Sequence, residues 1–196
     1  MKWFLKLYNY LNVCCQFVHL YCIMSVGDVM KKVSTKNIIL YIVTFLIVVI
    51  GDQLSKMLVS SAMILGQSET IIENFFYYTY SHNQGAAWGI LSGHVSLFIL
   101  IAVIALGAMI YYFSKTTKQE RLTRYGIVLT FAGAVGNIID RITLGYVRDF
   151  IDFVIFGYDF PVFNIADVAV VVGVGLIILE IIFEEYIYGN KKITSK

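Results

Sequence analysis

Four apolar stretches, each close to twenty residues long, constrain this chain more than any other feature. They cover approximately residues 37–59, 95–114, 124–142 and 161–184. A helix needs about 20 apolar residues to cross the ~30 Å hydrocarbon core of a bilayer. Of the 196 residues, 59% are hydrophobic and only 14% are charged, a composition typical of membrane proteins. The sequence therefore predicts an all-α membrane protein with four transmembrane helices.

Basic residues are distributed unequally among the connections between these stretches. Three of the 15 Lys and Arg residues, Lys56, Arg141 and Arg148, lie on one side, and the other twelve lie in the two chain ends and in connection 115–124. Cytoplasmic connections carry the excess of Lys and Arg. We therefore predict that both termini are cytoplasmic and that residues 60–94 and 143–160 face outward. Residues 71–81 are rich in Phe and Tyr and are expected to form strands of a small outward-facing sheet.

Two aspartates, Asp149 and Asp167, are expected near the outward ends of the last two helices. A carboxylate in or against hydrocarbon is costly, so it is usually paired, faces a cavity or has a function. Asp167 follows Asn164 by three residues, which places both on one helix face. Two close carboxylates titrate as a coupled pair and suit acid–base work on water. The pair is thus a candidate for catalysis.

Other polar residues are expected at the same depth in the membrane as the two aspartates. Asn137, Asp140 and Arg141 have the spacing of one helix face, and Arg141 is predicted to bridge Asp140 and another carboxylate. For Asp140 we favour a structural ion pair at the helix end. Asp52 and Lys56 also have ion-pair spacing, interpreted either as a snorkelling pair at the interface or as support for a site.

Several chemistries compete with a carboxylate pair. His19, His82 and His94 lack zinc-ligand spacing, and the sequence has no phosphate-binding loop. Asn83 suits either a clamp on a peptide backbone or a simple turn. A proton-relay transporter remains an alternative, although it predicts charges near the middle of the membrane and internal repeats. A structural membrane assembly protein is the other alternative, in which polar residues only join helices.

Five motifs occur in an order that identifies a resemblance. They are DQLSK (52–56), NQGAAW (83–88), GNIIDR (136–141), VRDF (147–150) and FNIAD (163–167). Together they resemble the motif set of the bacterial lipoprotein signal peptidases, also called type II or prolipoprotein signal peptidases. The resemblance covers about residues 36–185. One such block is weak support, whereas five in order on a four-span chain are highly specific.

The resemblance implies an aspartyl endopeptidase of the bacterial cytoplasmic membrane that needs no metal or other cofactor. Its substrates are diacylglyceryl-modified prolipoproteins, cut just before the lipidated cysteine near the outer leaflet. Asp149 and Asp167 match the catalytic pair. The resemblance implies no nucleic-acid partner, and we expect a monomer that contacts membrane lipid. Residues matching supporting positions are Asn83, Asn137, Arg141, Asn164, Asp52, Lys56 and Asp140.

The chain departs from the family pattern at two places. Arg148 stands before Asp149, where it is expected either to favour the charged form of the pair or to point to lipid headgroups. The N-terminal part has no counterpart, and Met30 resembles a natural start. We expect residues 1–35 to be a cytoplasmic extension, 36–185 the four-span catalytic domain and 186–196 a basic cytoplasmic tail. Residues 1–29 are expected to be dispensable or a mis-called start.

Overall fold

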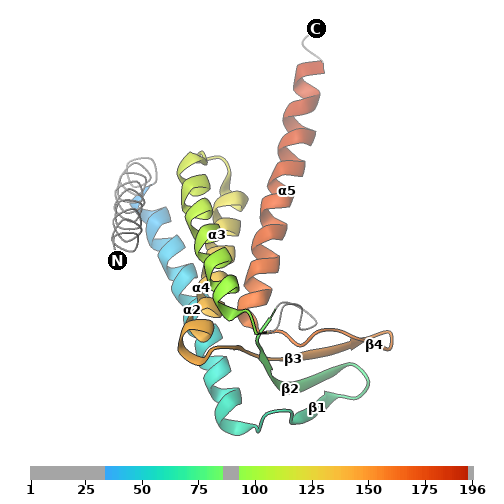
Figure 1. Cartoon of the computed structure of the whole chain (residues 1–196). Coiled ribbons are helices and arrows are strands. Elements are labelled where there is room, and N and C mark those ends of the chain that lie inside the picture. The colour runs from blue at the N-terminus through green and yellow to red at the C-terminus, as the bar shows by residue number, and fades with distance from the viewer. Residues whose placement is uncertain (1–33, 86–92, 194–196) are drawn as a thin grey trace, which may run out of the picture.

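Four long helices carry a small antiparallel sheet at one end of the molecule (Figure 1). The computed structural model describes residues 34–85 and 93–193. Its elements are α2 (Thr35–Ala62), β1 (Ser68–Ile72), β2 (Phe76–Asn83), α3 (Val95–Lys115), α4 (Arg121–Leu144), β3 (Val147–Ile155), β4 (Tyr158–Asp159) and α5 (Ile165–Ile193). Within these residues, four helices are long and apolar enough to cross a membrane. This confirms the predicted four spans and small sheet, while the cytoplasmic side of the termini remains a prediction.

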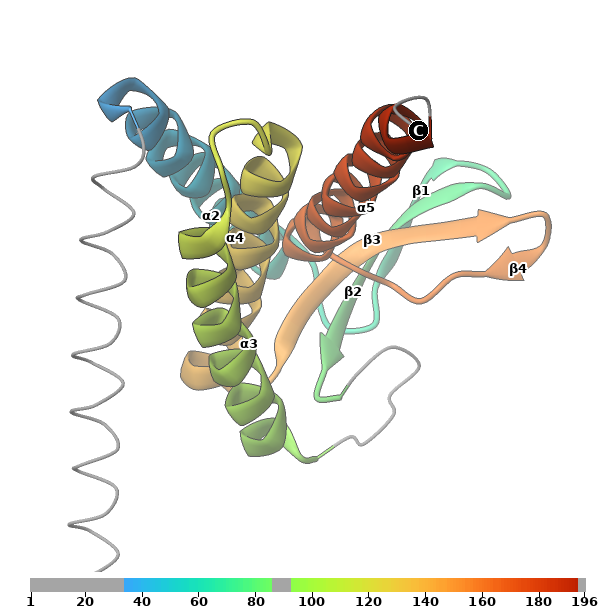
Figure 2. The ribbon, with the colours of Figure 1, turned by 90° about the horizontal axis from the view of Figure 1, so that it is seen from above.

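Helix α4 is the centre of the bundle and packs against α2, α3 and α5 (Figure 2). Its contact with α5 depends on small residues, because a Cβ atom on Gly126 would lie 2.5 Å from the carbonyl oxygen of Gly173. A Cβ atom on Gly133 would lie 2.2 Å from that of Ala166. Such close backbone approach is how helices associate where lipid gives no hydrophobic drive. Gly175 on α5, in contrast, faces open space.

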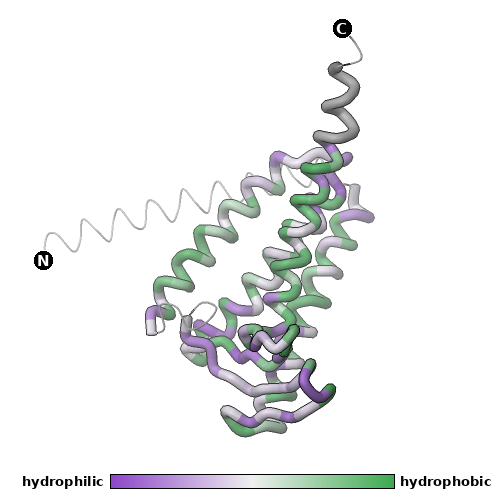
Figure 3. Tube along the Cα trace, turned by 90° about the vertical axis from the view of Figure 1, so that its right-hand side faces the viewer, coloured by the Kyte–Doolittle hydropathy of each residue, from purple (hydrophilic) through white to green (hydrophobic). Residues whose placement is uncertain are grey.

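The outer surfaces of the helices are apolar. Figure 3 shows hydrophobic residues along the helices and hydrophilic ones gathered near the sheet and the opposite helix ends. Helix α3 has no buried residue, and its Leu100, Val103 and Ile104 are each more than half exposed. So large an exposed apolar surface is unfavourable in water but suits contact with lipid chains.

The sheet has the order β1-β2-β3-β4 with antiparallel neighbours. The predicted strand region 71–81 is divided by a turn between β1 and β2. Between β2 and β3 the register slips, since Tyr78 pairs with Ile151 and Ser81 with Asp149. Two residues of β2 therefore face Phe150 alone, and such bulges redirect side chains. As a result, Asp149 and Phe150 are both buried although they are adjacent on a strand.

The segment between α4 and α5 brings the chain back to the helix ends. Gly145 ends α4 in the left-handed conformation (φ 79°), and its N–H binds the carbonyl of Arg141. β3 then runs away from the end of α4, and the chain returns so that Phe163 pairs with Ile151 of β3. Because Phe163 is held by β3, α5 begins at Ile165 and not directly after Pro161 as the apolar stretch suggested.

Candidate active site

Asp149 lies on β3, not on a helix, and only 2% of its surface is exposed. Its two carboxylate oxygens each accept a hydrogen bond from an asparagine side chain. Asn83 Nδ2 lies 2.9 Å from Oδ2, and Asn164 Nδ2 lies 2.6 Å from Oδ1. Burial, followed by the nearby charge of Asp167, raises the pKa of Asp149 to about 7. This carboxyl can therefore hold a proton near neutral pH.

Asp167 lies in the first turn of α5 and forms a reciprocal cap with Asn164. The Asp167 N–H donates to Asn164 Oδ1 and the Asn164 N–H donates to Asp167 Oδ2, both at 3.1 Å. This exchange fixes the helix start and both side chains together. The other Asp167 oxygen accepts a 2.8 Å hydrogen bond from Asn137 Nδ2.

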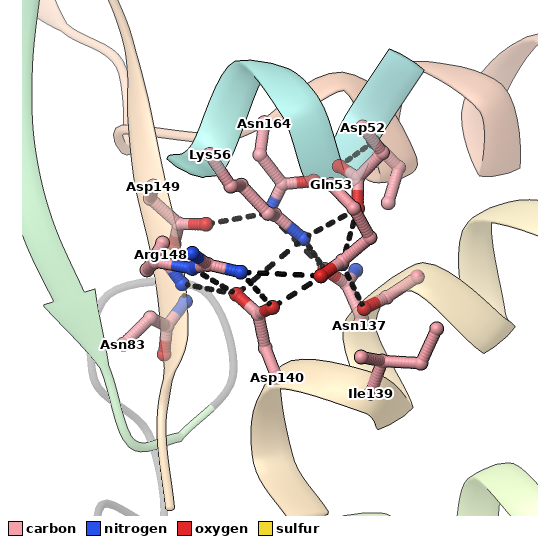
Figure 4. A network of polar contacts seen from close by, with 12 residues as sticks. Asp52, Gln53, Lys56, Asn83, Asn137, Ile139, Asp140, Arg148, Asp149 and Asn164 are labelled. Carbon is pink, nitrogen blue, oxygen red and sulfur yellow. Dashed lines mark hydrogen bonds and ion pairs between the residues drawn. The ribbon is translucent and has the colours of Figure 1, made fainter. Parts of the chain in front are cut away.

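Asn164 joins the two aspartates. It is fully buried, and its side chain and backbone N–H reach Asp149 and Asp167 respectively. Strand β3 and helix α5 are thus connected through one residue that binds both carboxyls. Figure 4 shows Asn164 and Asn83 on either side of Asp149. Asn83 Oδ1 also accepts from the Gly85 N–H, which is the expected turn, while binding of a substrate backbone by Asn83 stays a prediction.

Lys56 and Asn164 together set the orientation of Asn137. The Lys56 ammonium group lies 3.0 Å and Asn164 Nδ2 lies 3.2 Å from Asn137 Oδ1, and these two donors direct the Asn137 amide nitrogen toward Asp167. Lys56 is in turn paired with Asp52 at 2.9 Å and lies 3.8 Å from Asp140 (Figure 4). A neutral amide would otherwise fit in either of two orientations. The lysine therefore acts on Asp167 through Asn137.

The Asp52–Lys56 ion pair is formed, but it does not snorkel to the interface. Both side chains are 0% exposed, because this part of α2 packs against α4 and the start of α5. Asp52 Oδ1 accepts a 2.9 Å hydrogen bond from the N–H of Ala166 in the first turn of α5. Asp52 therefore supports the site by binding the first turn of α5.

Asp140 forms an ion pair with Arg148 rather than with Arg141. Arg148 Nη2 lies 2.7 Å from Asp140 Oδ1, and the Arg148 Nε and backbone N–H both bind Oδ2. The Arg148 guanidinium is thus bound by Asp140, while its expected effects on the aspartate pair or on lipid headgroups stay predictions. By holding the backbone N–H just before Asp149, Asp140 positions β3 against α4.

Arg141 faces the aspartate pair instead of bridging Asp140. Its Nη2 donates to the carbonyl of Gly85 at 3.2 Å, and its guanidinium lies 5.4 Å from the ring centre of Phe98. The predicted bridge to Asp140 is therefore wrong. Its charge interacts with Asp167 and Asp149. Its buried Nε has no hydrogen-bond partner among the described residues, so this donor is free for a ligand.

The charges of the site balance when the aspartate pair holds one proton. Three cations, Lys56, Arg141 and Arg148, face four carboxyl groups, Asp52, Asp140, Asp149 and Asp167. Buried charge is strongly unfavourable unless it is compensated. A single shared proton on Asp149 and Asp167 makes the whole cluster neutral.

Gln53 belongs to the site although no role was predicted for it. Its Nε2 lies within 3.2 Å of oxygens of Asp52, Gly136 and Asp140, and its Oε1 accepts from Arg148. Its position between two recognised residues of one motif was the only available signal.

Among residues 34–85 and 93–193, no group of three His, Cys, Asp or Glu side chains could hold a metal ion. Trp88 lies outside the described residues.

This arrangement suits activation of a water molecule between two carboxyls. Asparagine donors bind both carboxyls, and the Arg141 Nε has no hydrogen-bond partner among the described residues. Such a pair can take a proton from water and give one to a leaving group.

Several known proteins are similar to this chain. The family model described as "Signal peptidase (SPase) II" matches residues 44–183. A lipoprotein signal peptidase of Staphylococcus carnosus is 43% identical over 155 residues, covering 79% of this chain and 96% of that protein. One of Staphylococcus aureus strain JH9 is 47% identical over 145 residues, covering 74% and 87%. A bacterial membrane enzyme solved at 2.3 Å by the in meso method is similar with a TM-score of 0.70 and 45% identity, covering 74% of this chain and 88% of that one.

Proposed function

Because the chain belongs to the signal peptidase II family, we propose that it is an aspartic endopeptidase whose catalytic pair is Asp149 and Asp167. Members of this family remove signal peptides from prolipoproteins, and the chain is a multi-pass protein of the bacterial cytoplasmic membrane. The observation that carries the aspartic mechanism is the buried link from Asp149 through Asn164 to Asp167.

In the proposed reaction, the charged aspartate takes a proton from water, and the water oxygen attacks the scissile carbonyl carbon. The protonated aspartate donates a hydrogen bond to the carbonyl oxygen, which becomes an alkoxide-like oxygen in the tetrahedral intermediate. Collapse of the intermediate breaks the C–N bond, and a carboxyl proton passes to the leaving amine. The pair returns to its single-proton state after product release.

The surrounding residues act on this pair by position and charge. Asn83 and Asn164 hold Asp149, while Asn137 and the helix cap hold Asp167. The free Nε of Arg141 is placed to bind a substrate carbonyl. Preorganised donors of this kind stabilise developing negative charge without rearrangement.

We further propose that cleavage falls just before the diacylglyceryl-modified cysteine. The signal peptide is an apolar helix in the bilayer, and the lipid on its cysteine keeps the scissile bond near the outer leaflet. With both termini in the cytoplasm, the aspartates and the sheet lie at that depth. Binding of the lipid far from the reacting bond then contributes to placing the bond between the carboxyls. The enzyme is expected to act as a monomer on prolipoproteins and membrane lipid, without a cofactor and without nucleic acid.

The decisive experiment is cleavage of a purified diacylglyceryl-modified prolipoprotein by the full chain. Asp149→Asn and Asp167→Asn are expected to lower the rate by at least ~10⁴-fold, as loss of a catalytic group does. Asp159→Asn is the matched control, because this aspartate is exposed on β4 and its removal leaves the pair intact. An unlipidated prolipoprotein tests the requirement for lipid, and removal of residues 1–29 tests whether they are dispensable.

Full activity of either folded mutant would overturn the aspartic mechanism. Cleavage of the unlipidated protein at the same rate would overturn the proposed substrate requirement but leave the mechanism in place. If well-folded wild type cleaves neither protein, proton flux in liposomes becomes the next measurement, because it tests the proton-relay alternative.

A further inference from the structure

An apolar groove lies between α2, α3 and α4, at the part of the bundle remote from the aspartates. Its volume is about 380 Å³, and its lining is almost purely apolar, with aromatic rings from Phe45, Phe113 and Phe131. Both α2 and α3 pack on α4, and Tyr41 meets Phe113 edge to face at a 5.6 Å ring separation where the two helices touch. The groove is large enough for part of a small ligand.

A second, more polar cavity of about 330 Å³ adjoins this groove at the helix ends. Tyr41 lines both cavities, so the two cavities are neighbours at its side chain. The second cavity is also lined by Lys36 at the start of α2 and Arg121 at the start of α4. An apolar groove therefore lies next to a cavity lined by two cations from different helices.

Both cations are uncommitted within the described part of the chain, where neither Lys36 nor Arg121 forms an ion pair. The neighbouring charged side chains are already bound within the protein. Arg124 is buried and donates hydrogen bonds to Thr116. The Glu180 carboxylate accepts hydrogen bonds from the N–H groups of Leu122 and Thr123 at the start of α4. The Tyr41 hydroxyl likewise makes no hydrogen bond to any residue that the structure describes.

We propose that this double cavity binds an anionic glycerophospholipid of the bilayer. One acyl chain fills the groove between α2 and α3, and the phosphate lies between Lys36 and Arg121 with the Tyr41 hydroxyl beside it. The site changes from an apolar groove to a pair of cations. This order matches a phospholipid, whose hydrocarbon chains lead to an anionic phosphate. With the topology proposed above, the lipid belongs to the inner leaflet. The site is separate from the aspartate pair and does not depend on the catalytic mechanism.

Native mass spectrometry of the full chain tests this site with phosphatidylglycerol and phosphatidylcholine that carry the same acyl chains. A cation near an anionic lipid contributes about fivefold to binding, so two cations predict a preference for phosphatidylglycerol on the order of 25-fold. Lys36→Gln with Arg121→Gln is expected to reduce this preference to about twofold or less. Lys118→Gln is the matched control, because Lys118 is exposed at the same end but lines neither cavity.

A second variant tests the groove itself. Ile42 lines the groove and is 53% exposed, so Ile42→Trp should fill the groove without burial of a new group, and binding of both lipids should fall. Ile39→Trp is its control, since Ile39 is 56% exposed on the same helix and does not line the groove. Unchanged thermal denaturation of each variant shows that it is folded.

Four results would overturn the proposal. The first is an equal effect of Lys118→Gln and of Lys36→Gln with Arg121→Gln, which indicates general surface charge. The second is an equal effect of Ile39→Trp and Ile42→Trp. The third is lipid binding that appears only after deletion of residues 1–29, which indicates that the chain's own N-terminal segment occupies the groove. Displacement of the lipid by inorganic phosphate alone would likewise exclude an acyl chain as an essential part of the ligand.

Discussion

Asn164 donates a 2.6 Å hydrogen bond from its side-chain amide to Oδ1 of Asp149, across the gap between helix α5 and strand β3. Its side-chain oxygen is already used, because it accepts the N–H of Asp167 at 3.1 Å. The amide therefore has only one orientation that satisfies both partners. The position of Asp149 relative to Asp167 is thus determined by the start of a helix, a rigid element, and not by the strand alone.

Replacement of Asn164 by Asp tests this relationship. Asn164→Asp keeps the oxygen that caps Asp167 but replaces the donor to Asp149 with a carboxylate, which disfavours a second charge nearby. We expect cleavage to fall by at least ~10²-fold and the alkaline limb of the remaining activity to move to higher pH, as measured by kcat/KM from pH 5 to 9. Asn74→Asp, in the turn between β1 and β2, is the control and should resemble wild type. An unshifted limb would contradict the role assigned to Asn164.

The activity of the wild type should fall as pH rises above neutrality. Burial and the charge of Asp167 raise the pKa of Asp149 to about 7, so the shared proton is lost as pH increases through this value. Because the reaction needs one proton on the pair, kcat/KM should decrease about tenfold per pH unit above about pH 7. Rates measured with lipidated prolipoprotein in several buffers check this expectation. A constant kcat/KM from pH 7 to 9 would exclude a singly protonated pair.

The same proton links stability to pH. Asp149 has a pKa of about 7 in the folded protein and ~3.9 when unfolded, so between these values only the folded state holds the proton. The unfolded state then binds fewer protons, and the free energy of unfolding decreases as pH rises from about 4 to about 7. Asp149→Asn cannot titrate, so its thermal midpoint in detergent should decline less over this range. Parallel declines for both proteins would refute the linkage.

The four spans and the residues of the site could be predicted because each depends on local sequence. Twenty apolar residues suffice for a helix in lipid, and Asn164 and Asp167 share a helix turn wherever that helix packs. Partners across the fold could not be predicted in this way. Arg141 and Arg148 follow Asp140 by one and eight positions, and only the left-handed turn at Gly145 returns Arg148 to Asp140.

The burial of charged side chains was the other property that could not be predicted from the local sequence. Lys56 has the spacing and flanking residues of a snorkelling lysine, yet it is fully buried because α2 crosses the start of α5 at this level. Gly136 explains how this is possible, since its lack of a side chain leaves room for Asp52. The strand that carries Asp149 was also missed, because β3 pairs with residues far away in sequence.

Gly136 and Gly175 form a matched pair of test positions. A Cβ atom on Gly136 would lie 2.6 Å from Asp52 Oδ2, whereas one on Gly175 would meet nothing within 4 Å. Gly136→Ala should lower the free energy of unfolding by about 1–3 kcal/mol through overpacking and should also reduce cleavage. Gly175→Ala should leave stability unchanged or raise it by up to about 1 kcal/mol, because Ala favours helix. Thermal denaturation and cleavage rates of both variants decide this, and equal effects would contradict the close approach at Gly136.

The buried Lys56 should be indispensable for stability only while its carboxylate partners are charged. Lys56→Met leaves Asp52 and Asp140 without that cation in a site closed to water, and removal of one partner of a buried pair destabilises by about 3–5 kcal/mol. Adding Asp52→Asn removes one uncompensated charge and keeps an oxygen for the N–H of Ala166. The double mutant should therefore be more stable than Lys56→Met alone, by about 1 kcal/mol or more.

Chemical denaturation of both variants measures this coupling, with Lys118→Met as the control for loss of an exposed lysine, where the change should stay within about 0.5 kcal/mol. Cleavage separates stability from positioning. In the double mutant, Asn137 Oδ1 keeps the Asn164 amide as a donor but loses the charged one, which weakens the orientation of its own amide toward Asp167, so activity should recover less than stability. Recovery of both together would show that Lys56 acts only as a structural cation. Recovery of neither would show that Asp52 and Lys56 do not compensate each other's charge.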